Sequence, residues 1–148
     1  MQARSLIVVL AGALSACAMA AQQDQAALPP DALQLAGTQW KFVKFDGHDV
    51  PPAVNATLVF ESNGHVSGHA GCNGYGGPWE ASNGALHFGG MISTKMACLQ
   101  PPGAMQTEHD VFTALRATES ARMQDRQLIL LDASGSALAT LEPQGGSQ

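Results

Sequence analysis

The chain has 148 residues, of which 45% are hydrophobic and 13% are charged, and its formal net charge is −5. A mildly acidic chain without a run of Lys or Arg lacks the cations that neutralise phosphates, so nucleic-acid binding is not expected. This length suits one domain with a single core.

The N-terminal residues predict an export signal. Arg4 precedes the apolar stretch Ser5 to Leu14, which has the length of a signal-peptide core and is too short to span a bilayer. The sequence Leu14-Ser15-Ala16-Cys17 follows and resembles a lipobox, in which the cysteine sulfur receives a diacylglycerol and the chain is cut before it. We therefore expect residues 1–16 to be a lipoprotein signal peptide and Cys17 to be lipidated.

Ordinary secretion is the alternative, because Ala18-Met19-Ala20 fits the small-x-small pattern of plain signal peptidase. Ala18 directly after the cysteine favours sorting to the outer membrane, by resemblance to Gram-negative lipoproteins. The protein is then expected on the periplasmic face, where its acyl chains make the membrane contact.

Composition divides the rest of the chain into three parts. Residues 17–36 comprise the lipidated cysteine and a stretch rich in Ala, Gln and Pro, which is typical of a flexible tether. We expect one folded domain at residues 37–143 and a polar tail at 144–148.

Within the domain, short apolar stretches alternate with turn signals such as Asp46-Gly47 and Ser62-Asn63-Gly64. The strands predicted from this pattern cover residues 39–45, 56–61, 65–70, 85–88, 91–96, 128–131 and 137–141. The last two flank a turn at residues 132–135. The pattern predicts a mainly β fold: a small antiparallel sheet or open barrel of about seven or eight strands.

One helix is predicted at residues 104–118, which lack Gly and Pro and follow Pro101-Pro102-Gly103. Met105, Glu108, Phe112 and Leu115 lie on one side at helical spacing, with Ala104, Val111 and Ala114 as further candidates for that side, which we expect to pack against the sheet.

Two motifs in the middle of the chain are the most distinctive. The first, glycine-rich motif contains Gly71-Cys72-Asn73 and then Tyr75, and the second, about twenty residues later, reads Thr94-Lys95-Met96-Ala97-Cys98. With Trp40 before them and the acidic helix after them, these motifs resemble the META/HslJ domain in the same order. The resemblance covers nearly all of residues 37–143.

The resemblance implies a mostly antiparallel β fold with one helix, in an envelope protein linked to heat shock, stress or antibiotic tolerance. It implies no established catalytic activity. The candidate site is therefore the loop of the family motifs, and we expect neither a cofactor nor a metal. Its residues are Gly71, Asn73, Tyr75, Thr94 and Lys95.

Three of these candidates have a structural alternative. Asn73 either holds its loop through hydrogen bonds from its side chain to the backbone, or recognises a ligand beside Tyr75. Thr94 and Lys95 are either ordinary strand surface or part of a ligand site.

Cys72 and Cys98 are the two cysteines left once Cys17 is lipidated. The oxidising periplasm favours a disulfide between them. The alternative is a thiol enzyme, with Cys72 near His69 and Asn73, but glycine-rich strands offer neither the helix N-terminus nor the cations that activate a thiol. We therefore expect no catalytic residue.

Two histidines, His65 and His69, have the residue type of metal ligands. They fall on one face of a predicted strand but about 13 Å apart, which is too far to share one ion.

The sequence thus predicts a non-enzymatic envelope lipoprotein that binds a protein or small-molecule partner. A second hypothesis is an inhibitor or assembly partner of a larger envelope protein, acting through an ordered protruding loop at residues 74–79 or 99–103. The thiol enzyme is the third.

Overall fold

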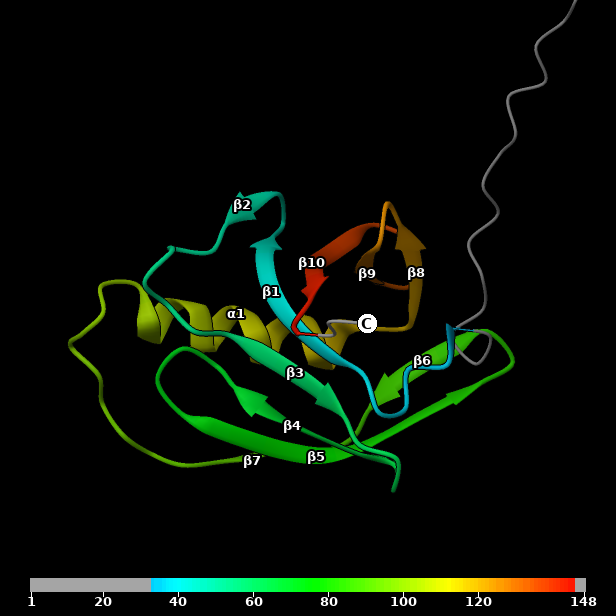
Figure 1. The fold of residues 1–148 in the computed structure, drawn as a ribbon, viewed down its shortest axis with the longest axis horizontal. Helices are drawn as coiled ribbons and strands as arrows, with labels where there is room; N and C mark the ends of the chain where they lie inside the picture. Colours follow the sequence, from blue (N-terminus) through cyan, green and yellow to red (C-terminus); the bar gives the residue numbers. More distant parts are fainter. Residues whose placement is uncertain (1–32, 146–148) are drawn as a thin grey trace, which may run out of the picture.

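The computed structural model describes residues 33–145. The predicted signal peptide, Cys17, most of the predicted tether and the end of the tail lie outside the described residues. The described chain forms ten strands and one helix (Figure 1). They are β1 (Gln39–Phe45), β2 (His48–Asp49), β3 (Thr57–Phe60), β4 (His65–His69), β5 (Gly74–Ser82), β6 (Ala85–Phe88), β7 (Ile92–Ser93), α1 (Ala104–Ala117), β8 (Ser120–Gln124), β9 (Gln127–Leu131) and β10 (Ala137–Pro143).

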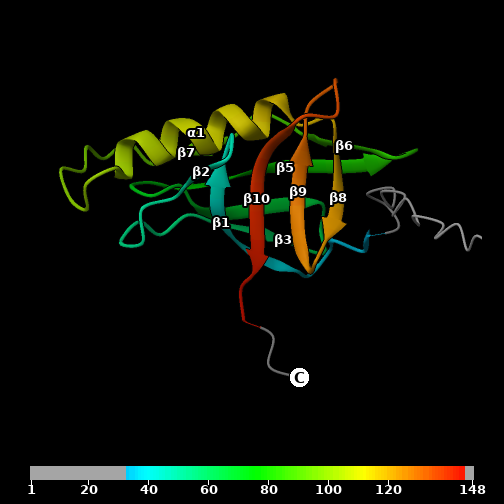
Figure 2. The same ribbon diagram turned by 90° about the horizontal axis from the view of Figure 1, so that it is seen from above.

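The strands form one antiparallel sheet in the order β6-β5-β4-β3-β1-β10-β9-β8, with β2 added to β1 and β7 added to β5. The two ends of the sheet approach each other, because the Leu86 N–H donates a hydrogen bond of 2.9 Å to the carbonyl of Glu119 beside β8. The result is a nearly closed barrel, and α1 lies along one side of it (Figure 2). The predicted mainly β fold with one packed helix is confirmed.

Apolar side chains at alternate positions fill the barrel. Leu58 and Phe60 of β3 are fully buried, as are Phe42 of β1 and Leu141 of β10. Alternation alone would put Phe45 on the outer face of β1, but it is buried too. The register with β10 shifts between Phe42 and Lys44, and this bulge turns Phe45 back into the core.

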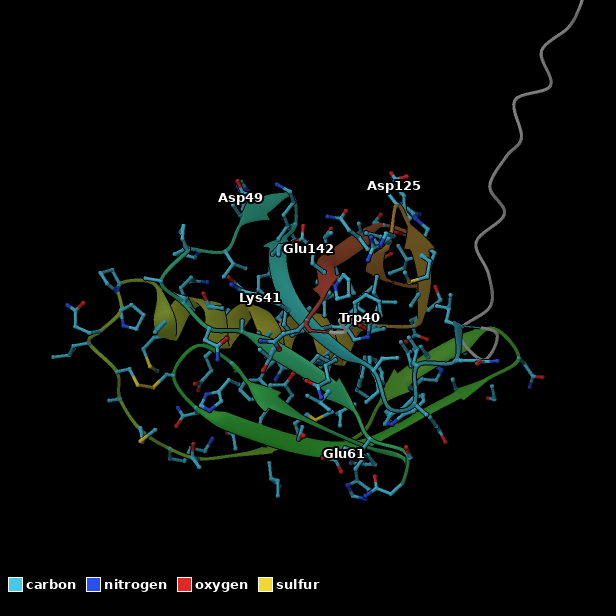
Figure 3. The ribbon with its side chains drawn as sticks, viewed as in Figure 1. Trp40, Lys41, Asp49, Glu61, Asp125 and Glu142 are labelled. Carbon is cyan, nitrogen blue, oxygen red and sulfur yellow. A yellow bond between two sulfur atoms is a disulfide. The ribbon has the colours of Figure 1, made fainter. Side chains whose placement is uncertain are left out.

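Several acidic side chains lie in or next to the ends of strands, as Figure 3 shows for Asp49 in β2, Glu61 beyond β3 and Asp125 beyond β8. The predicted turn at residues 132–135 is present, and Asp132 organises it. One Asp132 carboxylate oxygen accepts hydrogen bonds from the Ser134 hydroxyl and from the Ser136 and Ser134 N–H groups. These hydrogen bonds hold the pKa of the Asp132 carboxyl below its usual range.

The helix packs one face against the barrel, through buried side chains that include Thr107, Val111 and Leu115. Met105, predicted on that face, is instead 45% exposed. Of the predicted side chains, Ala104, Val111, Ala114 and Leu115 are buried. The small Ala104 and Thr107 allow the first turn of the helix to approach the β4–β5 turn closely.

Three strands are not predicted from the sequence. Residues 74–79, expected as a protruding loop, are the first part of the nine-residue strand β5, and neither the two-residue β2 nor β8 is expected from the pattern. Conversely, the strand predicted at residues 91–96 is reduced to the two residues of β7.

The packed domain begins earlier than residue 37, where the sequence placed it, because Leu35 is 2% exposed and belongs to the core. Between residues 33 and 145, no helix is both long and apolar enough to cross a membrane.

Candidate functional site

The turn between β4 and β5 brings the first family motif against the start of α1. Gly71 has a φ of +88°, and a Cβ there would lie 2.7 Å from the Ala104 carbonyl oxygen. A side chain at this position is therefore excluded both by backbone conformation and by space. Gly71 lets the turn contact the helix and delivers Asn73 to its partners.

Asn73 is 1% exposed and sits where three segments meet. Its side-chain N–H groups donate to the Met96 carbonyl over 3.0 Å and to a Glu108 carboxylate oxygen over 2.8 Å. Its side-chain oxygen accepts from the Thr94 hydroxyl at 2.7 Å and from the Met96 N–H at 2.8 Å. The Asn73 backbone N–H also donates to Glu108, over 3.1 Å.

These contacts use the whole hydrogen-bonding capacity of the side chain, since an amide has two donor hydrogens and two acceptor lone pairs. No donor or acceptor is left for a ligand. The interpretation that Asn73 holds its loop is therefore the one that the geometry supports. Its partners extend beyond the loop to the segment after β7 and to α1.

The two cysteines of the motifs are linked. Cys72 and Cys98 form a disulfide with a Cα–Cα distance of 5.7 Å. In this state Cys72 carries no thiol, and His69, the base that a thiol enzyme would need, is exposed at the end of β4.

Tyr75 points into the barrel, where its hydroxyl donates to the Thr57 carbonyl over 2.8 Å. Its ring meets Phe112 of α1 edge-on, with centroids 5.6 Å apart. A Cβ on Gly68 would lie 2.1 Å from the Thr57 oxygen, so the glycine makes room for this contact. Burial raises the pKa of the Tyr75 hydroxyl far above its usual value, so the group stays neutral and structural.

The structure thus brings Gly71, Asn73 and Thr94 together. Tyr75 follows two residues after Asn73, in β5, and is buried in the barrel. Lys95 is separate from them: it is exposed and lines a groove of about 480 Å³ beside them.

That groove was missed by sequence reasoning. One wall is the edge of the sheet at residues 89–95, and the other is the exposed side of α1. The helix wall carries Met105, Glu108, His109, Phe112 and Arg116, which recur at helical spacing. This spacing was the available signal, but it was interpreted as a face packed against the sheet.

Large apolar side chains are exposed in the chain between β7 and the start of α1, and one of them, Met105, lines the groove. Within the described residues, the exposed ones are Leu99 (89%), Ile92 (79%), Met96 (57%) and Met105 (45%). All four lie in residues 92–105, a stretch that we call the apolar segment. Figure 1 shows it leaving β7 and swinging out at one end of the domain before α1 begins.

No group of three or more His, Cys, Asp and Glu side chains that could hold a metal ion is present in the described part of the chain. His65, at the start of β4, and His69, at its end, are both exposed.

Comparison with known proteins identifies the family. The META domain matches residues 33–145, which confirms the resemblance inferred from the two motifs. Among curated proteins, none matches the chain.

Solved structures share the fold. A protein from Burkholderia xenovorans, solved by NMR, is 30% identical, with a TM-score of 0.65 over 81% of this chain and 90% of that one. A second NMR structure is 22% identical, with a TM-score of 0.59 over 74% and 92% of the two chains. The crystal structure of a DUF4847 family protein from Bacteroides vulgatus is 13% identical, with a TM-score of 0.53 over 76% and 96%.

Proposed function

The chain belongs to the META domain family, and we propose that it is a non-enzymatic envelope lipoprotein that works by binding a partner. In this proposal Cys17 carries the lipid and holds the domain at the periplasmic face of the outer membrane. The lipobox-like Leu14 to Cys17 and the Ala18 that follows support this anchor. The domain then supports envelope integrity under heat or antibiotic stress.

The observation that carries partner binding is the apolar segment. Large apolar side chains exposed together on a soluble domain mark interaction sites, because leaving them in water is costly. Here the exposed large apolar side chains of the described residues all fall within residues 92–105. A disulfide at Cys98 and the two hydrogen bonds between Asn73 and Met96 hold this segment in place.

A role without catalysis is supported by what the motif residues do. Asn73 has no free hydrogen-bonding group, Tyr75 is buried as a neutral phenol, and Cys72 is in a disulfide. None of the three offers a nucleophile or a proton-transferring group at the surface.

Photo-crosslinking in the native envelope tests partner binding. A photoreactive amino acid replaces Leu99 in the full chain, and the matched control carries it at Asn63, an exposed turn residue outside the apolar segment. We expect one discrete crosslinked product from position 99 and none from position 63. Equal crosslinking at both positions, or none at position 99, would reject the apolar segment as a partner surface.

The anchor is tested by intact mass and membrane fractionation of the mature protein. We expect an acylated Cys17 and release into the soluble periplasm in the Cys17→Ser variant. An unmodified protein cut after Ala20 would reject the lipid anchor.

The exposed Leu99 also favours a second candidate, an inhibitor or assembly partner of a larger envelope protein. Residues 99–103 form the protruding connection that this role requires, whereas residues 74–79 lie in β5. Mass spectrometry of the crosslinked product separates the two roles: an inhibitor lowers the activity of the captured protein when the purified chain is added.

A further inference from the structure

Among the described residues, β7 pairs with β5 alone, so its outer edge has no strand partner there. Thr94 N–H donates to the Gly74 carbonyl over 3.1 Å, and Ser93 faces Tyr75 in the register. In an antiparallel ladder this makes the pair of Ser93 and Tyr75 a non-hydrogen-bonded one, so the Ser93 N–H and C=O point away from β5. The same alternation turns the backbone groups of Met91 and Lys95 outward.

Outside the ladder with β5, these outward groups make no hydrogen bond to any other described residue. The two ends of the sheet are joined at β6, where the Leu86 N–H donates to the Glu119 carbonyl. They separate beyond Gly89-Gly90. The open stretch is the sheet-edge wall of the groove. An exposed sheet edge of this kind accepts an added strand.

The helix wall suits an extended chain in length and in character. From Met105 to Arg116 the helix rises about 16 Å, which matches about five residues of extended peptide. Phe112 and Met105 supply apolar contacts along this wall, as does Met91 on the opposite wall.

The charged side chains that line the groove indicate which kind of peptide it binds. Lys95 on one wall and Arg116 on the other are exposed cations, with His109 between them along the helix, in a chain whose net charge is −5. The acidic group in the groove is Glu108, and one of its oxygens already accepts two N–H groups from Asn73. An incoming acidic peptide therefore meets one cation on each wall of the groove.

From this geometry we infer that the groove between β7 and α1 binds an extended, carboxylate-bearing peptide segment of a partner protein, which adds to β7 as a further strand. Backbone hydrogen bonds to Met91, Ser93 and Lys95 hold the peptide. Lys95 and Arg116 select a segment with an acidic side chain or a C-terminal carboxylate. The inference rests on the proposed function, whose partner it specifies.

The probe is a synthetic peptide, acetyl-Thr-Val-Thr-Val-Asp, titrated into the isotope-labelled full chain and followed by NMR. We expect amide shifts centred on Met91, Ser93 and Lys95, and slower hydrogen exchange at these amides. An amidated form keeps the side-chain carboxylate alone, and a form ending in Asn keeps the terminal one alone. Comparison of the two identifies which carboxylate the groove recognises.

Two peptide controls test the strand geometry. A form ending in an amidated Lys reverses the charge, and we expect it to bind weakly. N-methylation of alternate residues removes either the N–H groups that face β7 or those that face away. We expect one of the two N-methylated peptides to lose binding and the other to keep it.

The protein variants test the charges. Lys95→Glu combined with Arg116→Glu should weaken binding roughly tenfold or more. The matched control is Lys41→Glu combined with Arg122→Glu, which changes net charge equally on β1 and β8, away from the groove (Figure 3 labels Lys41). We expect the control to keep its affinity, and both variants to keep the amide spectrum of the folded domain.

Three results would each overturn the inference: no binding at millimolar peptide, equal loss in the control variant, or amide shifts away from the groove. Crosslinking at Leu99 without peptide binding would reject the inference that an acidic peptide adds to β7, and it would still support the proposed function. Peptide binding without crosslinking at Leu99 would reject the apolar segment and keep the groove.

Discussion

Replacing Asn73 by Ala should cost the domain a large part of its stability. Four side-chain hydrogen bonds are lost, three to neutral groups and one to the Glu108 carboxylate. A neutral hydrogen bond contributes about 1 kcal/mol net and a charged one about 2 kcal/mol. Met96 is 57% exposed, so water replaces part of what its backbone loses. We therefore expect a loss of about 3 kcal/mol, against a total of about 5 to 15 kcal/mol for a domain.

Equilibrium unfolding in urea measures this loss. At a slope of about 1.5 kcal/mol/M, the unfolding midpoint should fall by about 2 M with the slope unchanged. Asn55→Ala is the matched control, because Asn55 is exposed and makes no side-chain hydrogen bond within the described residues. A loss below about 1 kcal/mol for Asn73→Ala, or one equal to that of the control, would refute the view that this side chain joins the three segments.

Three further predictions follow from the site. Gly68→Ala should lower the free energy of unfolding by more than about 2 kcal/mol in the same urea assay, because its Cβ would lie 2.1 Å from a backbone oxygen. Gly90→Ala is the control: a Cβ there would have nothing within 4 Å, so stability should change by less than about 0.5 kcal/mol. Reduction of the disulfide between Cys72 and Cys98, 26 residues apart, should lower stability by about 3.5 kcal/mol, and equal urea midpoints with and without reductant would contradict this. Tyr75 is the single tyrosine of the chain, and burial raises its folded-state pKa, so stability is full below about pH 10 and falls as the pH rises further. Its tyrosinate absorbance should therefore appear only together with unfolding, and a tyrosinate signal from the folded protein would show that the hydroxyl is accessible.

Periodic and short-range patterns could be predicted from the sequence. Leu58 and Phe60 alternate with less apolar neighbours, and they are fully buried as expected. The helix starts at Ala104, as predicted, and ends one residue before the predicted Thr118. The family motifs located the turn that holds Gly71 and Asn73. These features depend on residues close together in the chain, which is why the sequence reports them.

β5 could not be predicted because its glycines and Pro78 are typical of a loop, not of a strand. The structure shows why glycine is needed there: a Cβ on Gly77 would lie 2.7 Å from the Met91 sulfur. These positions are glycine because a segment from elsewhere in the chain approaches them closely, and not because glycine favours strands. For the same reason no local pattern indicates that Glu108 accepts two hydrogen bonds from Asn73, 35 residues away.

Asn73 also connects the family motif to the groove, because its partner Glu108 lines the helix wall and its partner Thr94 lies between Ser93 and Lys95 of the sheet-edge wall. Thr94 and Met96 belong to the chain that leaves β7, and Glu108 belongs to α1. A side chain that bonds to both segments fixes the distance between them, and therefore the width available to an added strand. The buried motif thus has a role at the surface without touching a ligand: it sets the geometry of the groove. In Asn73→Ala protein kept folded at low temperature, peptide affinity should fall although Lys95, Arg116 and the β7 edge are all still present. An unchanged affinity would show that the walls of the groove keep their spacing without Asn73.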